Sequence, residues 1–339
     1  MIPPSLEACA DIYWKPSELG ALPIDHMERR DGITIVTSFF DVDRSKWGYL
    51  ESEVSTKYQR DNAFYVKCFE RLASVRNDMI IFVAPEMAPM VKAARALHGN
   101  LDRTIILTID ELFSVGEVRR LVERISGQMT DAFRDFIWRP NAPEYNKPKY
   151  VALISLKATF VQTAIDMHLI RNRQVAWIDF GYVRNDNAVY QGEEWLFDFG
   201  DQINLFNIFK LDGTPIYDVV RRADAYFQGG HIVGPTSEWS FFRQSLDEAL
   251  QHLIACDLID DEQTLMLMAQ RAYPDRFRIR RHGADPDYDW RFILKRFQTG
   301  LTPKDRELEA VRRSSSPVWF LYLKTLIRRR VRRLVQRLR

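Results

Sequence analysis

Short apolar runs alternate with segments of helical spacing through the first half of the chain. Residues 33–40 (ITIVTSFF) are rich in β-branched and aromatic residues, which is typical of a buried strand. The apolar runs 79–85 and 103–110 predict two further strands, and residues 174–179 (QVAWID) predict a fourth. Because strands that alternate with helices usually pair in parallel, this pattern predicts an α/β fold with a mostly parallel central sheet flanked by helices.

The remaining pattern completes the expected order of elements. Residues 150–170 (YVALISLKATFVQTAIDMHLI) predict one long helix. In the second half, residues 225–234 predict a strand that contains a glycine pair, and the segments 237–256 and 264–272 predict helices. Residues 1–31 carry several early prolines, so we expect an N-terminal extension with little regular structure.

Composition is that of a folded protein. The 339 residues are 46% apolar and 12% aromatic, which suits one large core or two smaller ones and argues against disorder. The three cysteines are widely spaced and form no CxxC pair. Neither a disulfide framework nor a structural zinc site is therefore indicated, and a reducing, cytoplasmic setting fits best.

Positive charge is concentrated at the C-terminal end. Ten of the 48 Lys and Arg residues lie within 312–339, where there is no Asp or Glu, so the other 38 stand against all 46 acids and the body carries a net charge of −8. An acidic body argues against nucleic-acid binding over a broad face.

The C-terminal segment 301–339 predicts a linker and a basic amphipathic helix. Leu323, Ile327, Val331, Leu334 and Leu338 share one helical face, and arginines surround it. Such a helix suits an anionic membrane surface; an RNA-binding arm and docking to an acidic partner are the alternatives. The N-terminus does not resemble a signal peptide, and we find no apolar stretch of about 18 residues. We therefore expect a cytoplasmic protein attached peripherally to the inner face of the plasma membrane.

The first candidate for chemistry is Asp179, which ends the apolar run WID and is followed by Gly181. Open parallel sheets bind ligands at the carboxyl ends of their strands. Asp179 would accept hydrogen bonds from a ribose or hold Mg²⁺ or Mn²⁺ against a diphosphate, and Gly181 would allow close approach of the ligand. The alternative is an aspartate that caps a turn. Asp186 offers a loosely spaced second carboxylate.

Two further sites are candidates for ligand contacts. Gly229 and Gly230 interrupt an apolar strand, which indicates a bulge or a close backbone approach, and His231 beside them is either a ligand or a structural residue. Lys157 lies in a mostly apolar helix and needs an anionic partner, which would be a diphosphate, an internal carboxylate or a solvated edge.

The acidic run DLIDDEQ offers a general base at the start of a helix. Asp261 or Glu262 could deprotonate an acceptor hydroxyl. The local pattern also fits helix capping, with Asp260 as N-cap and Gln263 completing a capping box. The two roles are compatible, because the cap and the base can be neighbouring residues.

Several common catalytic motifs do not occur in the sequence. There is no G-x-x-x-x-G-K-[ST], no G-x-G-x-x-G, no G-x-S-x-G and no H-E-x-x-H. P-loop NTPases, dinucleotide-binding domains, esterases and zinc proteases are therefore disfavoured.

Four ordered segments, TIVTSFFDVDR, YVALISLKATFVQTAI, WIDFGY and GGHIVG…DDEQTL, resemble the HtrL/YibB-like bacterial family. That family is grouped with the GT-A class of nucleotide-sugar glycosyltransferases, and the resemblance covers roughly residues 32–280. It implies a GT-A-like, Rossmann-type nucleotide-sugar transferase fold, which we place at 32–300. It also implies transfer from a nucleotide-sugar donor, UDP-linked, to a glycan or lipid-linked glycan acceptor in lipopolysaccharide or capsule biosynthesis.

The resemblance also assigns residues to roles. The end of the first strand would line the base and ribose, through Thr37, Ser38, Phe39 and Phe40. Arg44 and Lys157 would reach the diphosphate. The metal-binding Asp-x-Asp of the class stands here as Asp179-Phe180-Gly181, so the second carboxylate is absent. Either Asp179 suffices, with His231 or Asp186 as a further ligand, or the enzyme depends only weakly on metal.

Asp261 and Glu262 match the position of the base in inverting members of the class. The reaction would then be a direct displacement at the anomeric carbon. The alternatives are a non-catalytic nucleotide-sugar or glycan-binding module, a scaffold of a polysaccharide assembly complex and, less favoured, a phosphotransferase.

Overall fold

The structure is a computed structural model that describes residues 5–17, 30–47, 60–280 and 293–298. The amphipathic helix predicted within 301–339 lies outside these residues, so the expected membrane attachment stays a prediction from the sequence. Within the described ranges, no helix combines the length and the apolar character needed to cross a membrane.

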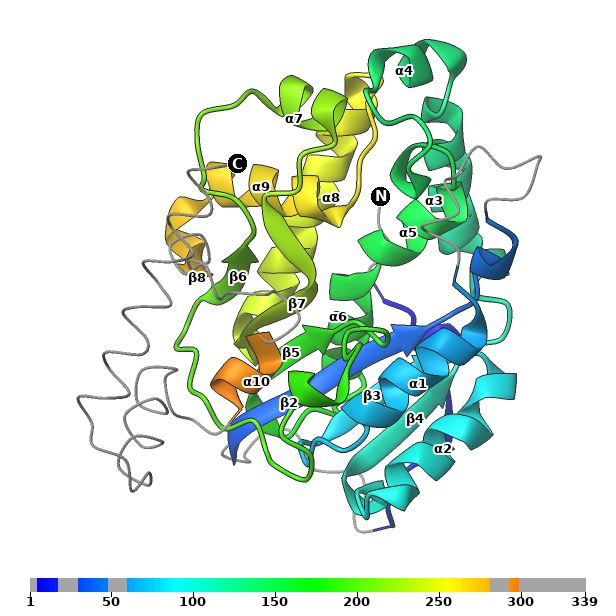
Figure 1. Ribbon diagram of the computed structural model, residues 1–339, viewed down its shortest axis with the longest axis vertical. Coiled ribbons are helices and arrows are strands. Elements are labelled where there is room, and N and C mark those ends of the chain that lie inside the picture. The colour runs from blue at the N-terminus through cyan, green and yellow to red at the C-terminus, as the bar shows by residue number, and fades with distance from the viewer. Residues whose placement is uncertain (1–4, 18–29, 48–59, 281–292, 299–339) are drawn as a thin grey trace, which may run out of the picture.

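A single sheet organises the fold, with the strand order β1-β4-β3-β2-β5-β7-β6-β8 in the described part of the chain (Figure 1). The pairings β4–β3, β3–β2, β2–β5 and β6–β8 are parallel, whereas β1–β4, β5–β7 and β7–β6 are antiparallel. The strands are β1 (Asp11–Trp14), β2 (Arg30–Phe39), β3 (Met79–Val83), β4 (Thr104–Thr108), β5 (Asn172–Ile178), β6 (Ile203–Asn207), β7 (Phe227–Pro235) and β8 (Phe277–Arg280).

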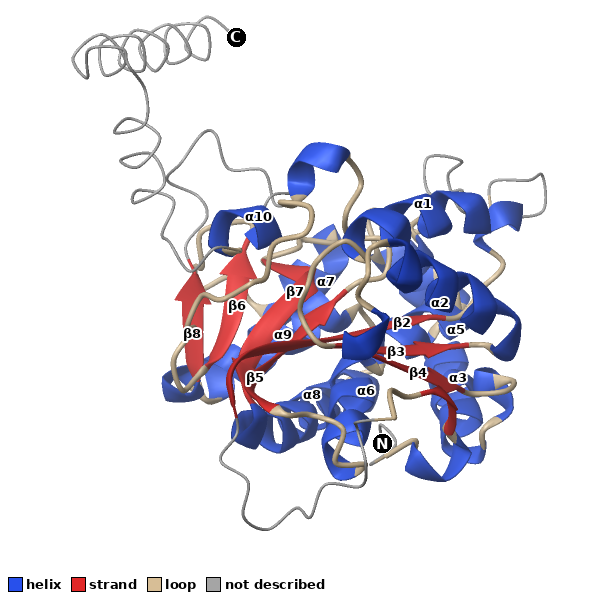
Figure 2. Ribbon diagram, turned by 90° about the horizontal axis from the view of Figure 1, so that it is seen from below, coloured by secondary structure: helices blue, strands red, loops and turns tan. Residues whose placement is uncertain are grey.

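Helices cover both faces of this sheet, with α1 and α2 on one side and α6 and α8 on the other (Figure 2). The expected α/β class, a central sheet flanked by helices, is confirmed. The described α-helices are α1 (Asn62–Leu72), α2 (Ala88–Leu97), α3 (Gly116–Gln128), α4 (Asp131–Phe136), α5 (Pro148–Ser155), α6 (Lys157–Asp166), α7 (Ile216–Arg222), α8 (Trp239–Ala255), α9 (Glu262–Ala272) and α10 (Ile293–Phe297).

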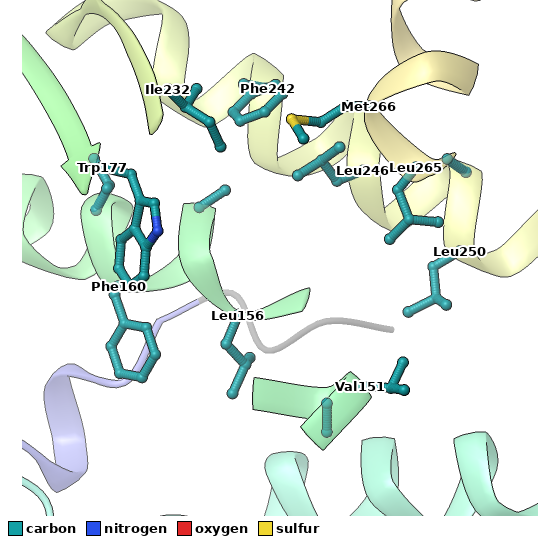
Figure 3. Packing of buried hydrophobic residues seen from close by; sticks show 14 of the residues in the cluster. Val151, Leu156, Phe160, Trp177, Ile232, Phe242, Leu246, Leu250, Leu265 and Met266 are labelled. Atoms are coloured by element: carbon teal, nitrogen blue, oxygen red, sulfur yellow. The ribbon is translucent and has the colours of Figure 1, made fainter. Parts of the chain in front are cut away.

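Alternate residues of each central strand enter different cores, because a strand points successive side chains to opposite faces. In β2, Val36 belongs to the core that also contains residues of α3, α5, α6, α8 and α9, whereas Ile35 belongs to the core that contains residues of α1 and α2. Figure 3 shows the first core, in which Trp177 of β5 lies beside Phe160 of α6. Burial on both faces explains why the central strands read as continuous apolar runs.

The structure corrects two sequence expectations about elements. Part of the expected N-terminal extension is structured: β1 pairs antiparallel with β4, and the buried Leu6 donates its N–H to Thr163 Oγ1 at 2.9 Å. The helix expected at 150–170 is divided into α5 and α6. At the break, the Ser155 hydroxyl donates to the Val151 carbonyl at 2.8 Å, a bond that often bends helices.

Candidate active site

A cavity of about 450 Å³ opens at the carboxyl ends of β2 and β5. From β2 the chain proceeds outward to β3 and then β4, whereas β5 lies on the other side of β2. The loops that follow β2 and β5 therefore diverge, and such a switch point in a parallel sheet is where open α/β folds bind ligands. Residues after both strands line the cavity together with the start of α9.

Asp179 directly follows β5 and faces this cavity with 41% of its side chain exposed. Its Oδ1 accepts hydrogen bonds from Trp177 Nε1 at 2.7 Å and from Lys157 Nζ at 2.9 Å. Gly230 of the adjacent β7 makes room for the carboxylate, since a Cβ there would lie 2.9 Å from Asp179 Oδ2. Trp177 and Lys157 therefore fix the orientation of the side chain. Both of them bond to Oδ1, so neither occupies Oδ2.

Lys157, the first residue of α6, is almost completely buried beneath the cavity. Its ammonium group contacts three acceptors: Asp179 Oδ1, Glu262 Oε1 at 2.6 Å and the Gly229 carbonyl at 3.0 Å. Burial alone would lower the pKa of Lys157, but the charges of Asp179 and Glu262 outweigh burial and raise it. Since an ammonium has three donors, internal carboxylates and a carbonyl already occupy them all.

Glu262 is the first residue of α9 and is buried against Lys157, with 7% of its side chain exposed. It lies directly over β7, where a Cβ at Gly229 would collide with its Oε1. Burial raises the pKa of Glu262, although Lys157 acts in the opposite direction. The Glu262 carboxylate is therefore buried in an ion pair with Lys157 and is poorly placed to contact a substrate.

Asp261 is half-buried and lines the cavity, so it is better placed than Glu262 to meet a substrate. Burial raises its pKa well above the usual range, and the nearby charges of Glu262 and Asp260 raise it further. Asp261 is also the N-cap of α9, because its Oδ1 accepts from the Gln263 N–H at 2.9 Å. The expectation that Asp260 is the cap was therefore wrong by one residue.

Asp260 lies deeper and supports this helix start from below. Its carboxylate accepts hydrogen bonds from the Tyr145 hydroxyl at 2.9 Å, the Thr264 hydroxyl at 2.7 Å and the Asp261 N–H at 2.9 Å. Burial raises the pKa of Asp260 to about 7 in spite of these bonds. The network holds the α9 terminus rigidly beside the cavity.

His231 does not take part in the cavity, which corrects its expected roles in donor and metal binding. It pairs with Ile178 in the β5–β7 ladder and shares its face with Val233, so the sheet separates it from Asp179. Its ring lies among Tyr182, Trp195 and Phe206, and neither ring nitrogen has a hydrogen-bond partner among the described residues. Burial lowers the pKa of His231 to about 3, so it is a neutral core residue at physiological pH.

The expected metal ligands do not come together. His231 points away from Asp179, and Asp186 is exposed and pairs with Arg71 at 2.6 Å. Within the described ranges, no group of three or more His, Cys, Asp or Glu side chains is arranged to hold a metal ion. Asp179 alone of the expected ligands lines the cavity, so the described residues supply one carboxylate there and not a complete set of metal ligands.

Most of the other expected site residues line the cavity. They are Ser38, Phe39, Phe40, Arg44, Lys157, Asp179, Gly181, Gly230, Asp261 and Glu262. Thr37 is fully buried in β2, and Gly229 contributes its carbonyl to Lys157 below the cavity.

Sequence reasoning missed three arginines, Arg60, Arg139 and Arg184, which line the same cavity. Arg184 lies five residues after Asp179, in the segment that follows β5. This position after a central strand was the only sequence feature that could have indicated its place in the cavity. Arg60 and Arg139 come from segments distant in sequence, and only the fold brings them to the cavity.

Comparisons with known proteins agree with the resemblance noted in the sequence. Residues 31–296 match the model of the HtrL_YibB family, described as a bacterial protein of unknown function. The chain is 32% identical over 269 residues to Protein HtrL of Escherichia coli K12, covering 77% of this chain and 91% of that protein. A crystal structure of mouse xyloside xylosyltransferase 1, apo form, is similar at a TM-score of 0.36 and 12% identity, covering 74% of this chain and 84% of that one. By its family match and this identity, the chain belongs to the HtrL/YibB family.

Proposed function

We propose that this protein is a glycosyltransferase that uses a nucleotide-sugar donor, and that Asp261 is its general base. The observation that carries the proposal is the arrangement of one cavity at the switch point of the sheet. Asp179 is fixed in it by Lys157 and Trp177, arginines line it, and Asp261 stands in its wall at the start of α9. Cationic and acidic groups in one cavity suit a substrate that carries both a diphosphate and hydroxyl groups.

The reaction proposed is a single displacement. An acceptor hydroxyl attacks the anomeric carbon of the donor, the new C–O bond forms, and the bond to the diphosphate oxygen breaks. The hydroxyl proton passes to the Asp261 carboxylate, and the nucleoside diphosphate leaves with the bonding electron pair. Asp179 would accept hydrogen bonds from donor hydroxyls.

Asp261 is preferred to Glu262 as the base on structural grounds. Glu262 pairs with Lys157 at 2.6 Å and is buried, whereas Asp261 is half-buried and faces the cavity. A carboxylate with a raised pKa is a stronger base once deprotonated. We therefore expect kcat to increase as pH rises through the raised pKa of Asp261.

The acceptor and the setting of the reaction are proposed from the sequence. We propose a glycan or lipid-linked glycan acceptor in surface polysaccharide synthesis. The basic segment 312–339 would hold the enzyme at an anionic membrane, where such an acceptor resides. Removal of this segment would then reduce activity on membrane-bound acceptors more than on soluble ones.

The test is release of nucleoside diphosphate from a panel of nucleotide sugars by the full-length protein. Asp261→Asn should lower kcat by about 10²–10⁴-fold. The substitution keeps an N-cap, because asparagine caps helices about as well as aspartate, so stability should change little. Asp186→Asn, which alters an exposed carboxylate outside the cavity, is the matched control. Full activity in the Asp261 variant, or no release from any donor, would contradict the proposal.

A further inference from the structure

We propose that Arg44, Arg60 and Arg184 form the binding site for the donor diphosphate, and that these arginines neutralise it in place of a divalent cation. This inference rests on the proposed function and deepens it. The three guanidinium groups come from three segments that meet at the cavity: the loop after β2, the residues before α1 and the loop after β5.

Arg44 is held in place by aromatic side chains. Its guanidinium carbon lies 4.7 Å from the ring centre of Trp47, 4.8 Å from that of Tyr150 and 5.7 Å from that of Tyr65, and Nη1 donates to the Tyr65 hydroxyl. Rings of this kind orient a cation without cancelling its charge. The Nε–H of Arg44 has no hydrogen-bond acceptor among the described residues. Arg44 is therefore fixed in orientation where it lines the cavity, and its buried Nε–H is unsatisfied by the described residues.

Arg60 and Arg184 bring further positive charge to the cavity that Arg44 lines. The Arg60 N–H donates to the Arg44 carbonyl at 3.4 Å, so the two segments run side by side. Arg60 and Arg184 both line the cavity. Burial lowers the pKa of Arg184 and the positive charge of Arg60 lowers it further, whereas the charge of Asp179 acts in the opposite direction. Guanidinium groups from separate segments that line one cavity suit a ligand with several anionic oxygens, and a diphosphate is such a ligand.

Tyr65 of α1 connects this arginine group to the loop after β5. Its ring packs directly on Gly181, where a Cβ would lie 2.7 Å from the ring. The same ring lies 5.2 Å from that of Phe39 at the end of β2. The arginine site is thus built on the ends of the two central strands and is continuous with Asp179.

The acidic part of the cavity already contains its cation. Lys157 bonds to Asp179, Glu262 and the Gly229 carbonyl, so a protein ammonium lies against the carboxylate that was expected to hold a metal. Guanidinium groups bind phosphate oxygens in bidentate fashion and keep their charge at all relevant pH values. Fixed positive charge where the leaving diphosphate gains negative charge is the stabilisation that the reaction requires.

Isothermal titration calorimetry of the full-length protein tests this inference. The ligand is inorganic pyrophosphate, in buffer stripped of divalent ions by a chelating resin, and the titration is repeated with Mn²⁺. We expect binding without metal and a Kd that changes less than about threefold on adding Mn²⁺, because the protein already supplies the neutralising charge. Arg60→Gln and Arg184→Gln should each weaken binding by about tenfold or more, as expected for the loss of a charged hydrogen bond.

Two controls separate charge from folding. Arg119→Gln changes an exposed arginine of α3 outside the cavity and should bind pyrophosphate like the wild type. Arg184→Lys keeps the charge but loses the planar fork, and it should bind with intermediate affinity. The melting temperature of each variant without ligand identifies any variant that has failed to fold. If Arg60→Gln or Arg184→Gln fails to fold, the pyrophosphate affinity of the other variant tests the inference.

Binding that requires Mn²⁺, or wild-type affinity in both glutamine variants, would overturn the inference. The proposed function is judged separately by nucleotide-sugar turnover. Turnover that depends on Mn²⁺ and is unaffected by the arginine substitutions would contradict this inference alone. Metal-free pyrophosphate binding without turnover of any nucleotide sugar would contradict the enzyme assignment and support the arginine site.

Discussion

Asp179 and His231 have different surroundings because they lie on opposite sides of the sheet. Asp179 directly follows β5 and His231 lies on the neighbouring β7, but alternation places the carboxylate in the cavity and the imidazole in an aromatic core. A sequence shows that both residues lie near strand ends and glycines. It does not show the pairing register, which decides the face each one occupies.

His231 should make stability depend on pH. Its pKa is about 3 in the folded protein against an ordinary value of 6.5, so the folded state binds fewer protons than the unfolded state between these values. The stabilisation is fully present above pH 6.5 and is lost as pH falls towards 3. We expect His231→Phe to gain stability relative to wild type by up to about 1.4 kcal/mol per pH unit in that range.

Urea unfolding of both proteins at pH 7, 5.5 and 4 measures this difference. The two unfolding free energies should diverge progressively as the solution is acidified. A difference that stays constant over this range would show that the imidazole is accessible to protons in the folded state.

At the scale of elements, the start of α9 combines three acidic residues with three different surroundings. Asp260 is buried and accepts hydrogen bonds from three neighbours, Asp261 caps the helix at the cavity, and Glu262 pairs with Lys157 of α6. The sequence identified this segment as both cap and candidate base. The assignment of roles within it depends on Lys157, which is distant in sequence.

The Lys157–Glu262 ion pair joins α6 to α9 and should be costly to break from one side only. Lys157→Met leaves a buried carboxylate without its cation, and we expect a loss of about 3–5 kcal/mol in the free energy of unfolding. Adding Glu262→Leu removes that carboxylate, so the double variant should be more stable than the single one.

Chemical unfolding of the single and double variants tests this coupling. A double variant less stable than Lys157→Met would mean that the pair does not act as a unit. Asp179 remains partly exposed in both variants, so its charge stays solvated.

The sequence predicted the central strands that are continuous apolar runs. It missed the edge strands and also β6, which is fully buried but contains two asparagines. β2, β3, β4 and β5 are continuous apolar runs because helices cover both sides of them. β1 and β8, at the edges of the sheet, are only four residues long and partly exposed, so they do not form such runs. The acidic candidates were found because they follow apolar runs, whereas the arginines come from irregular segments whose pattern carries no such signal.

Across the whole molecule, net negative charge lies in the body and net positive charge lies at the C-terminal end of the sequence. The body is acidic, whereas the segment 312–339 holds ten basic residues and no acidic one. Each basic residue near an anionic surface contributes about 1 kcal/mol to membrane binding, so this segment would bind strongly at low salt.

Co-sedimentation with vesicles tests the membrane prediction. Full-length protein should bind vesicles rich in anionic lipid at low ionic strength, and binding should weaken as salt is added. A protein lacking residues 315–339 should remain in the supernatant. Equal binding by the two proteins would rule out the C-terminal segment as the membrane anchor.

The central claim is that Asp179 faces a nucleotide-sugar cavity at the ends of β2 and β5. The most direct measurement is a thermal-shift screen of nucleotide sugars against the wild type and Asp179→Asn. A ligand that binds only the folded state raises the melting temperature by mass action. We predict that at least one nucleotide sugar raises the melting temperature of the wild type, and that this increase is lost in Asp179→Asn. An equal increase in both proteins, or none with any nucleotide sugar, would contradict the account.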